Sequence, residues 1–133
     1  MSNNLVILLL GTNLNNRNQN LEQAKNYIEK EVGKIEDFSA IIETEPDGFV
    51  SENKFLNQTL SVRTSLSPLQ LLKTIKGIEQ KMGRVYLPTS QKYQDRIIDI
   101  DILKFNAITF KTEELKIPHH QILTRNFVKK ILK

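Results

Sequence analysis

The 133-residue sequence contains no cysteine, which excludes disulfide bonds and thiol chemistry. This absence fits a reducing compartment, and we expect a cytoplasmic protein. The apolar run Leu5–Leu10 is too short to span a membrane, and no basic segment precedes it as one would in a signal peptide. The sequence also lacks internal repeats, low-complexity tracts and linkers. We therefore expect a single domain over residues 1–133, long enough to bury a hydrophobic core.

Two nucleotide-binding signatures are also missing. The sequence has no G-x-x-x-x-G-K-[ST] loop and no glycine-rich loop of the protein-kinase type, so both of those kinase classes are excluded. The formal net charge is +4 and the isoelectric point is about 9.3. A basic protein of this kind suits an anionic ligand such as a nucleotide, and it equally suits nucleic acid, so charge alone leaves both open.

Hydrophobic periodicity predicts strands and helices that alternate along the chain. The expected strands are Leu5–Leu10, Lys34–Thr44, Phe55–Thr64 and Asp95–Leu103, and the expected helices cover residues 17–31 and 67–83. This β-α-β-β-α-β order predicts an α+β, ferredoxin-like fold, in which an antiparallel sheet carries both helices on one face. A short C-terminal extension follows, with an expected hairpin at Asn106-Ala107 and a basic helix from about Thr124.

The second helix has the clearest signals at its ends. Ser67 is expected to be the N-cap and Pro68 the first helical residue, while Gly83 follows the last turn. The residues expected to form its apolar stripe are Leu69, Leu71, Leu72, Ile75, Ile78 and Met82.

The segment Asp95–Leu103 carries the most informative pattern. Because side chains alternate along a strand, its isoleucines (Ile98, Ile100 and Ile102) share one face, whereas Asp99 and Asp101 share the other. The two carboxylates start about 7 Å apart along the strand, and a hard divalent cation would relieve their repulsion. Arg96 is available nearby to hold an anion. Taken alone, the pattern also fits a surface strand with a solvated acidic face.

Six short motifs place this acidic strand in a wider context. They are Gly11-Thr12-Asn13-Leu14, Thr44-x-Pro46-x-Gly48, Phe55-Leu56-Asn57, Glu79-x-x-x-Gly83-Arg84, Arg96-x-x-Asp99-x-Asp101 and Ile117-Pro118-His119, the last followed by Arg125-x-Phe127. In this order and at these spacings they resemble the hydroxymethyl-dihydropterin pyrophosphokinase family of folate biosynthesis. The resemblance extends from about Leu5 to Phe127.

The resemblance implies an ATP-dependent diphosphotransferase. Members of the family transfer pyrophosphate from ATP to 6-hydroxymethyl-7,8-dihydropterin, giving the pterin diphosphate and AMP. The implied cofactors are two Mg²⁺ ions, and the implied partners are the small molecules ATP and a reduced pterin. The resemblance implies no nucleic-acid or membrane partner, and it suggests a monomer.

The resemblance also assigns roles to individual residues. Asp99 and Asp101 are the implied metal ligands, and Arg84 and Arg96 join them as the implied catalytic residues. The implied ATP-binding residues are Glu79, Arg84, Lys92, Arg96, Ile102, His119, His120 and Arg125. The implied pterin-binding residues are Thr44, Pro46, Phe55, Asn57, Tyr93, Asp99 and Phe127. Of these, Phe55 and Phe127 are expected to stack on the two faces of the pterin ring.

One position departs from the family pattern and leaves alternatives open. Tyr86 stands where relatives commonly carry a second arginine, so we expect a slower catalytic step. The first alternative is a catalytically impaired homologue that binds a pterin or a nucleotide. The second is a basic ferredoxin-like module that binds RNA, although Asp99 and Asp101 would repel phosphates without a metal. Glu79 has three interpretations: it orients Arg84, contacts the nucleotide, or is a plain surface residue.

Overall fold

The computed structural model describes residues 3–45, 53–84, 95–113 and 115–119. Its central strand is β1 (Asn4–Thr12), whose apolar run is buried between neighbours on both sides. It pairs antiparallel with β4 (Phe55–Thr64) and with β5 (Asp99–Phe105). Strand β2 (Gly33–Phe38) pairs with β4, and the short β3 (Ile42–Thr44) pairs with the beginning of β4. The resulting order β2-β4-β1-β5 confirms the predicted ferredoxin-like sheet.

Both helices begin at residues whose side chains cap them. Helix α1 (Arg17–Glu31) follows Asn16, which accepts a hydrogen bond from the Gln19 backbone N–H. Helix α2 (Pro68–Lys81) has the predicted N-cap at Ser67, which forms a capping box with Gln70. These local contacts satisfy backbone N–H groups that have no partner within the helix, and they explain why the sequence located both helices well.

The C-terminal end of α2 and its apolar stripe match the prediction except at one residue. Gly83 has a φ of 96° directly after the helix, a conformation that favours glycine. Leu71, Ile75 and Ile78 are buried as predicted, but Leu69 is 50% exposed. The placement of Leu69 on the stripe was wrong because two residues turn an α-helix by about 200°, so Leu69 lies on the opposite side of α2 from the buried Leu71.

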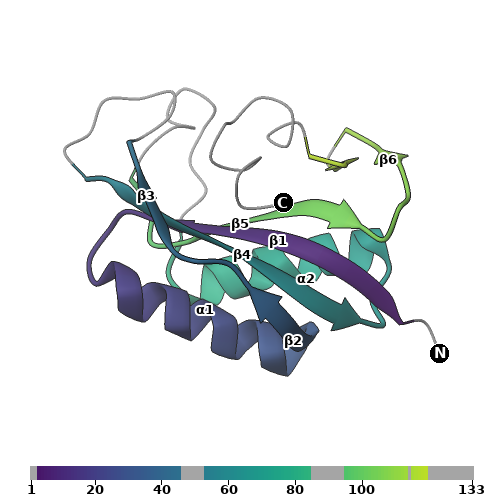
Figure 1. Cartoon of the computed structure of the whole chain (residues 1–133), viewed down its shortest axis with the longest axis horizontal. Coiled ribbons are helices and arrows are strands. Elements are labelled where there is room, and N and C mark those ends of the chain that lie inside the picture. The colour runs from purple at the N-terminus through teal and green to yellow at the C-terminus, as the bar shows by residue number, and fades with distance from the viewer. Residues whose placement is uncertain (1–2, 46–52, 85–94, 114, 120–133) are drawn as a thin grey trace.

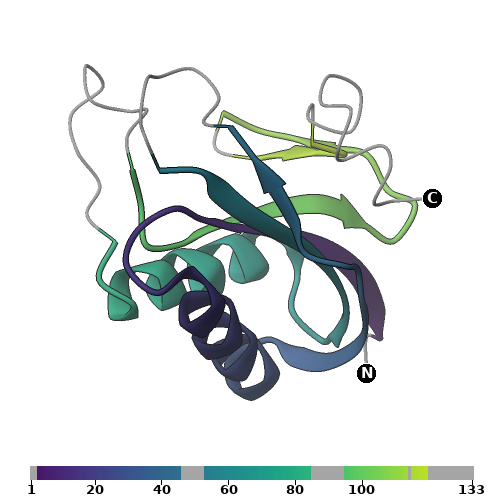
Figure 2. The same cartoon turned by 60° about the vertical axis from the view of Figure 1, so that its left-hand side comes forward.

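The helices cover one face of the sheet, and the core lies between them and the strands (Figures 1 and 2). Its members from the sheet and helices include Val6, Leu8, Leu10, Leu21, Ala24, Ile28, Leu60, Val62, Leu71, Ile75, Ile78, Ile98, Ile100 and Ile102. The opposite side is called the outer face below. No helix in the described part of the chain is long and apolar enough to cross a membrane.

A small ribbon lies over part of the outer face. It consists of β6 (Phe110–Lys111) paired with β7 (Lys116–Ile117), and β7 packs against β5 (Figures 1 and 2). The His119 backbone N–H donates to the carbonyl of Leu103 at 2.9 Å, and Leu103 is fully buried although it points away from the helices. The ribbon therefore leaves only part of the outer face accessible.

Three sequence predictions about strands need correction. The expected strand Lys34–Thr44 is broken between β2 and β3, because Ser39 exchanges hydrogen bonds with Thr59 through both its backbone and its side chain. The predicted hairpin at Asn106-Ala107 is wrong, since Asn106 turns the chain by bonding to the backbone of Leu5 and β6 then pairs with β7.

The third correction concerns the start of the acidic strand. Strand β5 begins at Asp99, whereas the sequence predicted it to start at Asp95. Asp95 and Arg96 are held by Asn13 instead of by a strand ladder. The basic helix predicted from about Thr124 lies outside the described residues.

Candidate functional site

Asp99 and Asp101 lie on the outer face at the beginning of β5, as the alternation of the strand predicted. Their side chains are each 27% exposed, whereas the intervening Ile100 is buried against the helices. Carboxylate oxygens are the ligands that Mg²⁺ prefers, so this pair fits a magnesium site. Within the ranges that the structure describes, no group of three or more acidic, histidine or cysteine side chains is placed so that it could hold a metal ion. The pair alone would leave most coordination positions to phosphate oxygens and water.

Arg84 connects the acidic strand to helix α2. Its Nη1 lies 2.6 Å from Asp99 Oδ1 and 3.1 Å from Glu79 Oε2. The same Glu79 oxygen accepts a 2.7 Å hydrogen bond from the backbone N–H of Ile100, and Glu79 is only 3% exposed. The surface interpretation of Glu79 is therefore wrong. Glu79 fixes the Arg84 guanidinium against the edge of the sheet, because its charge is held by two donors in a buried position.

Arg96 and His119 complete the charged cluster around the two aspartates. Arg96 Nη1 lies 3.4 Å from Asp99 Oδ2, so Asp99 is held between two guanidinium groups. His119 Nε2 lies 4.0 Å from Asp101 Oδ1. Five of the residues predicted from the sequence thus come together with Asp99 at one place on the outer face: Glu79, Arg84, Arg96, Asp101 and His119. Guanidinium groups remain charged and match phosphate oxygens, so the cluster suits a phosphorylated ligand.

A cavity of about 530 Å³ opens beside this cluster. Its lining residues include Leu72, Ile75, Lys76, Glu79, Arg84, Asp99, Asp101, Ile102, Glu113, Leu115, Lys116 and His119. One wall is β5, which is an edge strand of the sheet. The N–H of Ile100 points outward from this edge to Glu79, and the alternation of the backbone gives Ile102 the same orientation two residues later. The cavity therefore combines an apolar wall and a strand edge with charged groups at one end.

A second group of predicted residues lies further across the outer face. The strand register places Asn57 on β4 and Asp99 on β5 directly opposite Gly11 of β1, on its two sides. The amide nitrogen of Asn57 donates to the Ile42 carbonyl at 2.9 Å and to Thr44 Oγ1 at 2.8 Å. These two bonds use both amide hydrogens and fix the orientation of Asn57, which leaves Oδ1 to accept a hydrogen bond from a ligand.

The missing side chain of Gly11 leaves space between these groups. A Cβ added at Gly11 would lie 3.5 Å from Asn57 Oδ1 and 3.6 Å from Phe55 Cδ1. The ring of Phe55 stands at one side of this space, and the Arg96 guanidinium lies 5.8 Å from the centre of that ring. The predicted pterin residues Thr44, Phe55 and Asn57 are thus adjacent to the charged cluster.

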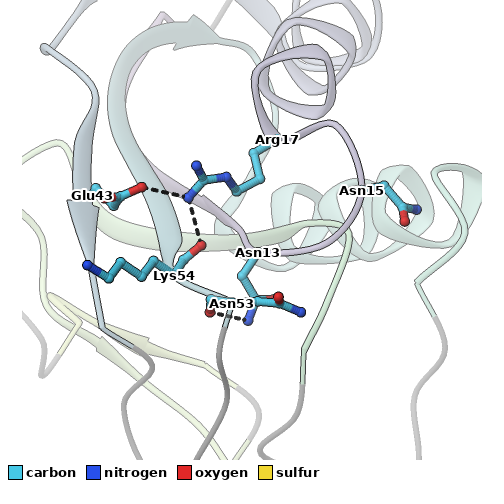
Figure 3. Close-up of a pocket in the computed structure, with 6 residues that line it drawn as sticks. All are labelled: Asn13, Asn15, Arg17, Glu43, Asn53 and Lys54. Carbon is cyan, nitrogen blue, oxygen red and sulfur yellow. Dashed lines mark hydrogen bonds and ion pairs between the residues drawn. The ribbon is translucent and has the colours of Figure 1, made fainter.

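Three residues near the site were not singled out for a role by the sequence analysis: Asn13, Asn53 and Asp95. They are linked by hydrogen bonds, and two of them, Asn13 and Asn53, line a second, polar cavity of about 370 Å³, which Figure 3 shows with Arg17, Glu43 and Lys54. The only signal was the motif Gly11-Thr12-Asn13-Leu14. Six predicted site residues lie outside the described part of the chain: Pro46, Lys92, Tyr93, His120, Arg125 and Phe127.

Comparison with known proteins agrees with this arrangement. The model of the family described as 7,8-dihydro-6-hydroxymethylpterin-pyrophosphokinase matches residues 7–133. A relative from Porphyromonas gingivalis, named 2-amino-4-hydroxy-6-hydroxymethyldihydropteridine pyrophosphokinase, is 37% identical over 126 residues, which cover 94% of this chain and 86% of the relative. A relative of the same name from Bacillus subtilis is 34% identical, covering 95% of this chain and 74% of the relative.

Solved structures support the fold. The HPPK-DHPS chain of Plasmodium falciparum, crystallised with pterin and p-hydroxybenzoate, superposes with a TM-score of 0.75 at 22% identity. The superposition covers 99% of this chain but only 38% of the larger one, so this chain spans about two fifths of that protein. The family match and the two bacterial relatives together carry the assignment: the chain belongs to the 7,8-dihydro-6-hydroxymethylpterin-pyrophosphokinase family.

Proposed function

We propose that the chain transfers pyrophosphate from ATP to 6-hydroxymethyl-7,8-dihydropterin in folate biosynthesis. The hydroxymethyl oxygen bonds to the β-phosphorus, the bond from that phosphorus to the α,β-bridging oxygen breaks, and AMP leaves with the bridging oxygen. The hydroxyl proton is released. The single observation that carries the proposal is the row formed by Asn57, Gly11 and Asp99 across strands β4, β1 and β5. This row brings the residues suited to the pterin ring beside the residues suited to phosphate and metal.

In this proposal, Asp99 and Asp101 hold two magnesium ions together with the triphosphate. Bound there, magnesium neutralises the phosphate oxygens and makes the substrate hydroxyl a better nucleophile. Support comes from the two partly exposed carboxylates on one face, which are the hard oxygen ligands that such an ion requires.

Arg84, Arg96 and His119 stabilise the charge that develops on the transferred group. In phosphoryl transfer the protein mainly positions the reactants and neutralises charge, so preorganised cations and hydrogen-bond donors are the main contribution of the side chains. Glu79 serves this role indirectly by holding Arg84 at 3.1 Å. The edge of β5 at Ile102 and the apolar wall of the 530 Å³ cavity are suited to the flat adenine base.

The pterin lies over Gly11 in this proposal. Asn57 Oδ1 accepts from N–H groups of the pterin, and Thr44, which already accepts from Asn57, can donate its hydroxyl hydrogen. A site built on such bonds rejects analogues that lack the matching groups. Phe55 offers an aromatic side to the ring. The monomeric state and the roles of the six residues outside the described part of the chain remain predictions from the family resemblance: Pro46, Lys92, Tyr93, His120, Arg125 and Phe127. The cytoplasmic location remains a prediction from the absence of cysteine.

The test is product analysis after mixing the protein with ATP, magnesium and 6-hydroxymethyl-7,8-dihydropterin. AMP and a pyrophosphorylated pterin are expected, whereas ADP would indicate an ordinary kinase and no product would indicate the impaired homologue. Asp99→Asn and Asp101→Asn are each expected to lower turnover about 1,000-fold, because each removes a charge that holds the metal. The matched control is Asp37→Asn, an exposed aspartate of β2 at the far edge of the sheet.

A further inference from the structure

Asn13 is a buried polar residue of the Gly11-Thr12-Asn13-Leu14 motif that the proposed chemistry leaves without a role. It follows β1 directly and is only 2% exposed, although its side chain carries a donor group and an acceptor. A buried amide of this kind must find hydrogen-bond partners or cost stability. Its partners come from two segments that are distant in the sequence.

Every polar atom of the Asn13 side chain is used. Its amide nitrogen donates to the backbone carbonyl of Asn53 at 3.1 Å and to Asp95 Oδ1 at 2.8 Å. Its amide oxygen accepts from the backbone N–H of Arg96 at 2.7 Å. Figure 3 shows Asn13 facing Asn53, with Asn15 lying well apart from both. The side chain therefore joins the end of β1 to the segments before β4 and before β5.

Two further contacts close this network. Asn53 Nδ2 donates to Asp95 Oδ2 at 2.9 Å, so the hydrogen bonds among Asn13, Asn53 and Asp95 form a closed ring that passes through the backbone carbonyl of Asn53. The backbone N–H of Asn13 also donates to the carbonyl of Arg96 at 3.1 Å. The backbone of Arg96 is thus held by Asn13 through both its N–H and its carbonyl.

The network lies next to residues of both substrate sites. Asn53 is two residues before Phe55, and Asp95 directly precedes Arg96. The Arg96 guanidinium reaches Asp99 at 3.4 Å and lies 5.8 Å from the centre of the Phe55 ring. A displacement at Asn13 would move the phosphate-binding arginine relative to the aromatic ring, and so change the distance between the two substrates.

We propose that Asn13 is a positioning residue for pyrophosphoryl transfer, which aligns Arg96 and Phe55 through its bonds to Asn53, Asp95 and Arg96. The proposal rests on the proposed function of the site. Asn13 touches neither reacting group, so its effect falls on the alignment of bound substrates and hence on kcat more than on either KM.

The test is a charge exchange between two neighbouring side chains. Asn13→Asp replaces the amide nitrogen, which now lies 2.8 Å from Asp95 Oδ1, with a second carboxylate oxygen. We expect kcat to fall about 100-fold as Arg96 shifts. The double variant N13D/D95N keeps the net charge of the wild type. It restores the bond between positions 13 and 95 and retains the bonds to Arg96 N–H and from Asn53, which is three of the four side-chain bonds. We expect it to recover most of kcat.

Two controls separate positioning from folding. Asn15→Asp makes the same chemical change two residues away on an exposed side chain and is expected to leave kcat unchanged. Asn53→Ala truncates an exposed side chain and removes only its bond to Asp95 Oδ2 from those above, so the fold is retained and a smaller loss of kcat is expected. Thermal unfolding of every variant accompanies the kinetics.

Three results would overturn the proposal: wild-type kcat in Asn13→Asp, no recovery in the folded double variant, or equal losses in Asn15→Asp. Failure of the proposed function is a separate outcome, visible as absence of AMP with the wild type. In that case the positioning role of Asn13 is tested by calorimetric titration with 6-hydroxymethyl-7,8-dihydropterin and a non-hydrolysable ATP analogue. Positioning predicts weaker coupling between the two ligands in Asn13→Asp and its return in the double variant, and unchanged coupling would refute it.

Discussion

Replacing Gly11 with alanine probes where the substrate ring lies on the outer face. The added Cβ would lie 3.5 Å from Asn57 Oδ1 and 3.6 Å from Phe55 Cδ1, both ordinary van der Waals distances. The substrate-free fold therefore accommodates the methyl group without moving the sheet. Because alanine also restricts the unfolded chain, we expect the free energy of unfolding to change by less than about 1 kcal/mol.

The same methyl group occupies space that a flat ring over Gly11 requires. It also approaches Asn57 Oδ1, the oxygen that we expect to accept from the pterin. One methyl group in a pocket that closely fits its ligand changes the free energy of binding by roughly 1–3 kcal/mol, so the KM for the pterin should rise about 10- to 100-fold. The KM for ATP should stay within about threefold of the wild-type value, because the nucleotide cavity does not include Gly11.

The assay is AMP formation with each substrate varied in turn, together with thermal unfolding. Gly77→Ala on α2 is the matched control, since a Cβ at Gly77 would have no atom within 4 Å. An unchanged KM for the pterin in folded Gly11→Ala would refute the placement of the ring over β1. A rise in both KM values would point instead to a general disturbance of the sheet.

Further predictions concern the cations, the metal and the stability of the fold. Glu79→Gln keeps an acceptor for the Ile100 N–H at the sheet edge but loses the charge that holds Arg84. The rate of the chemical step, measured in single turnovers, should therefore fall about tenfold, and an unchanged rate would contradict this. EDTA should abolish AMP formation without lowering the unfolding temperature of the substrate-free protein, because Asp99 already has cationic partners, as calorimetry can check. Ser67→Ala should cost about 1 kcal/mol and lower the unfolding temperature by roughly 3–5 °C relative to Ser65→Ala, measured by circular dichroism.

Local patterns in the sequence located much of this fold. The predicted N-cap of α2 depends on a contact three residues away, and the faces of Asp99 and Ile100 depend on alternation within one strand. Such features need no knowledge of distant residues, which is why they could be predicted. The ferredoxin-like order then followed from the order of the elements.

The features that sequence reasoning missed depend on distant partners. Asn13 and Asp95 are 82 residues apart, and their bond explains why β5 starts four residues later than predicted. The turn at Asn106 is set by the backbone of Leu5, 101 residues away, and so the hairpin did not form. In both cases a polar side chain found a partner that only the folded chain brings near, and hydrophobic periodicity carries no trace of it.

At the beginning of strand β5, neighbouring residues serve different purposes: one side chain packs in the hydrophobic core and the next faces the functional site. Ile98, which directly precedes the strand, and Ile100 and Ile102 within it are buried against the helices, while Asp99 and Asp101 face the other way. A substitution scan from Ile98 to Ile102 should therefore give a saw-tooth profile. Protein abundance in cells would drop at the even positions, and turnover per molecule would drop at the odd positions. A screen that scores growth alone would not distinguish these two effects. Measuring protein abundance and turnover separately would show which side chains of the strand face the core and which face the site.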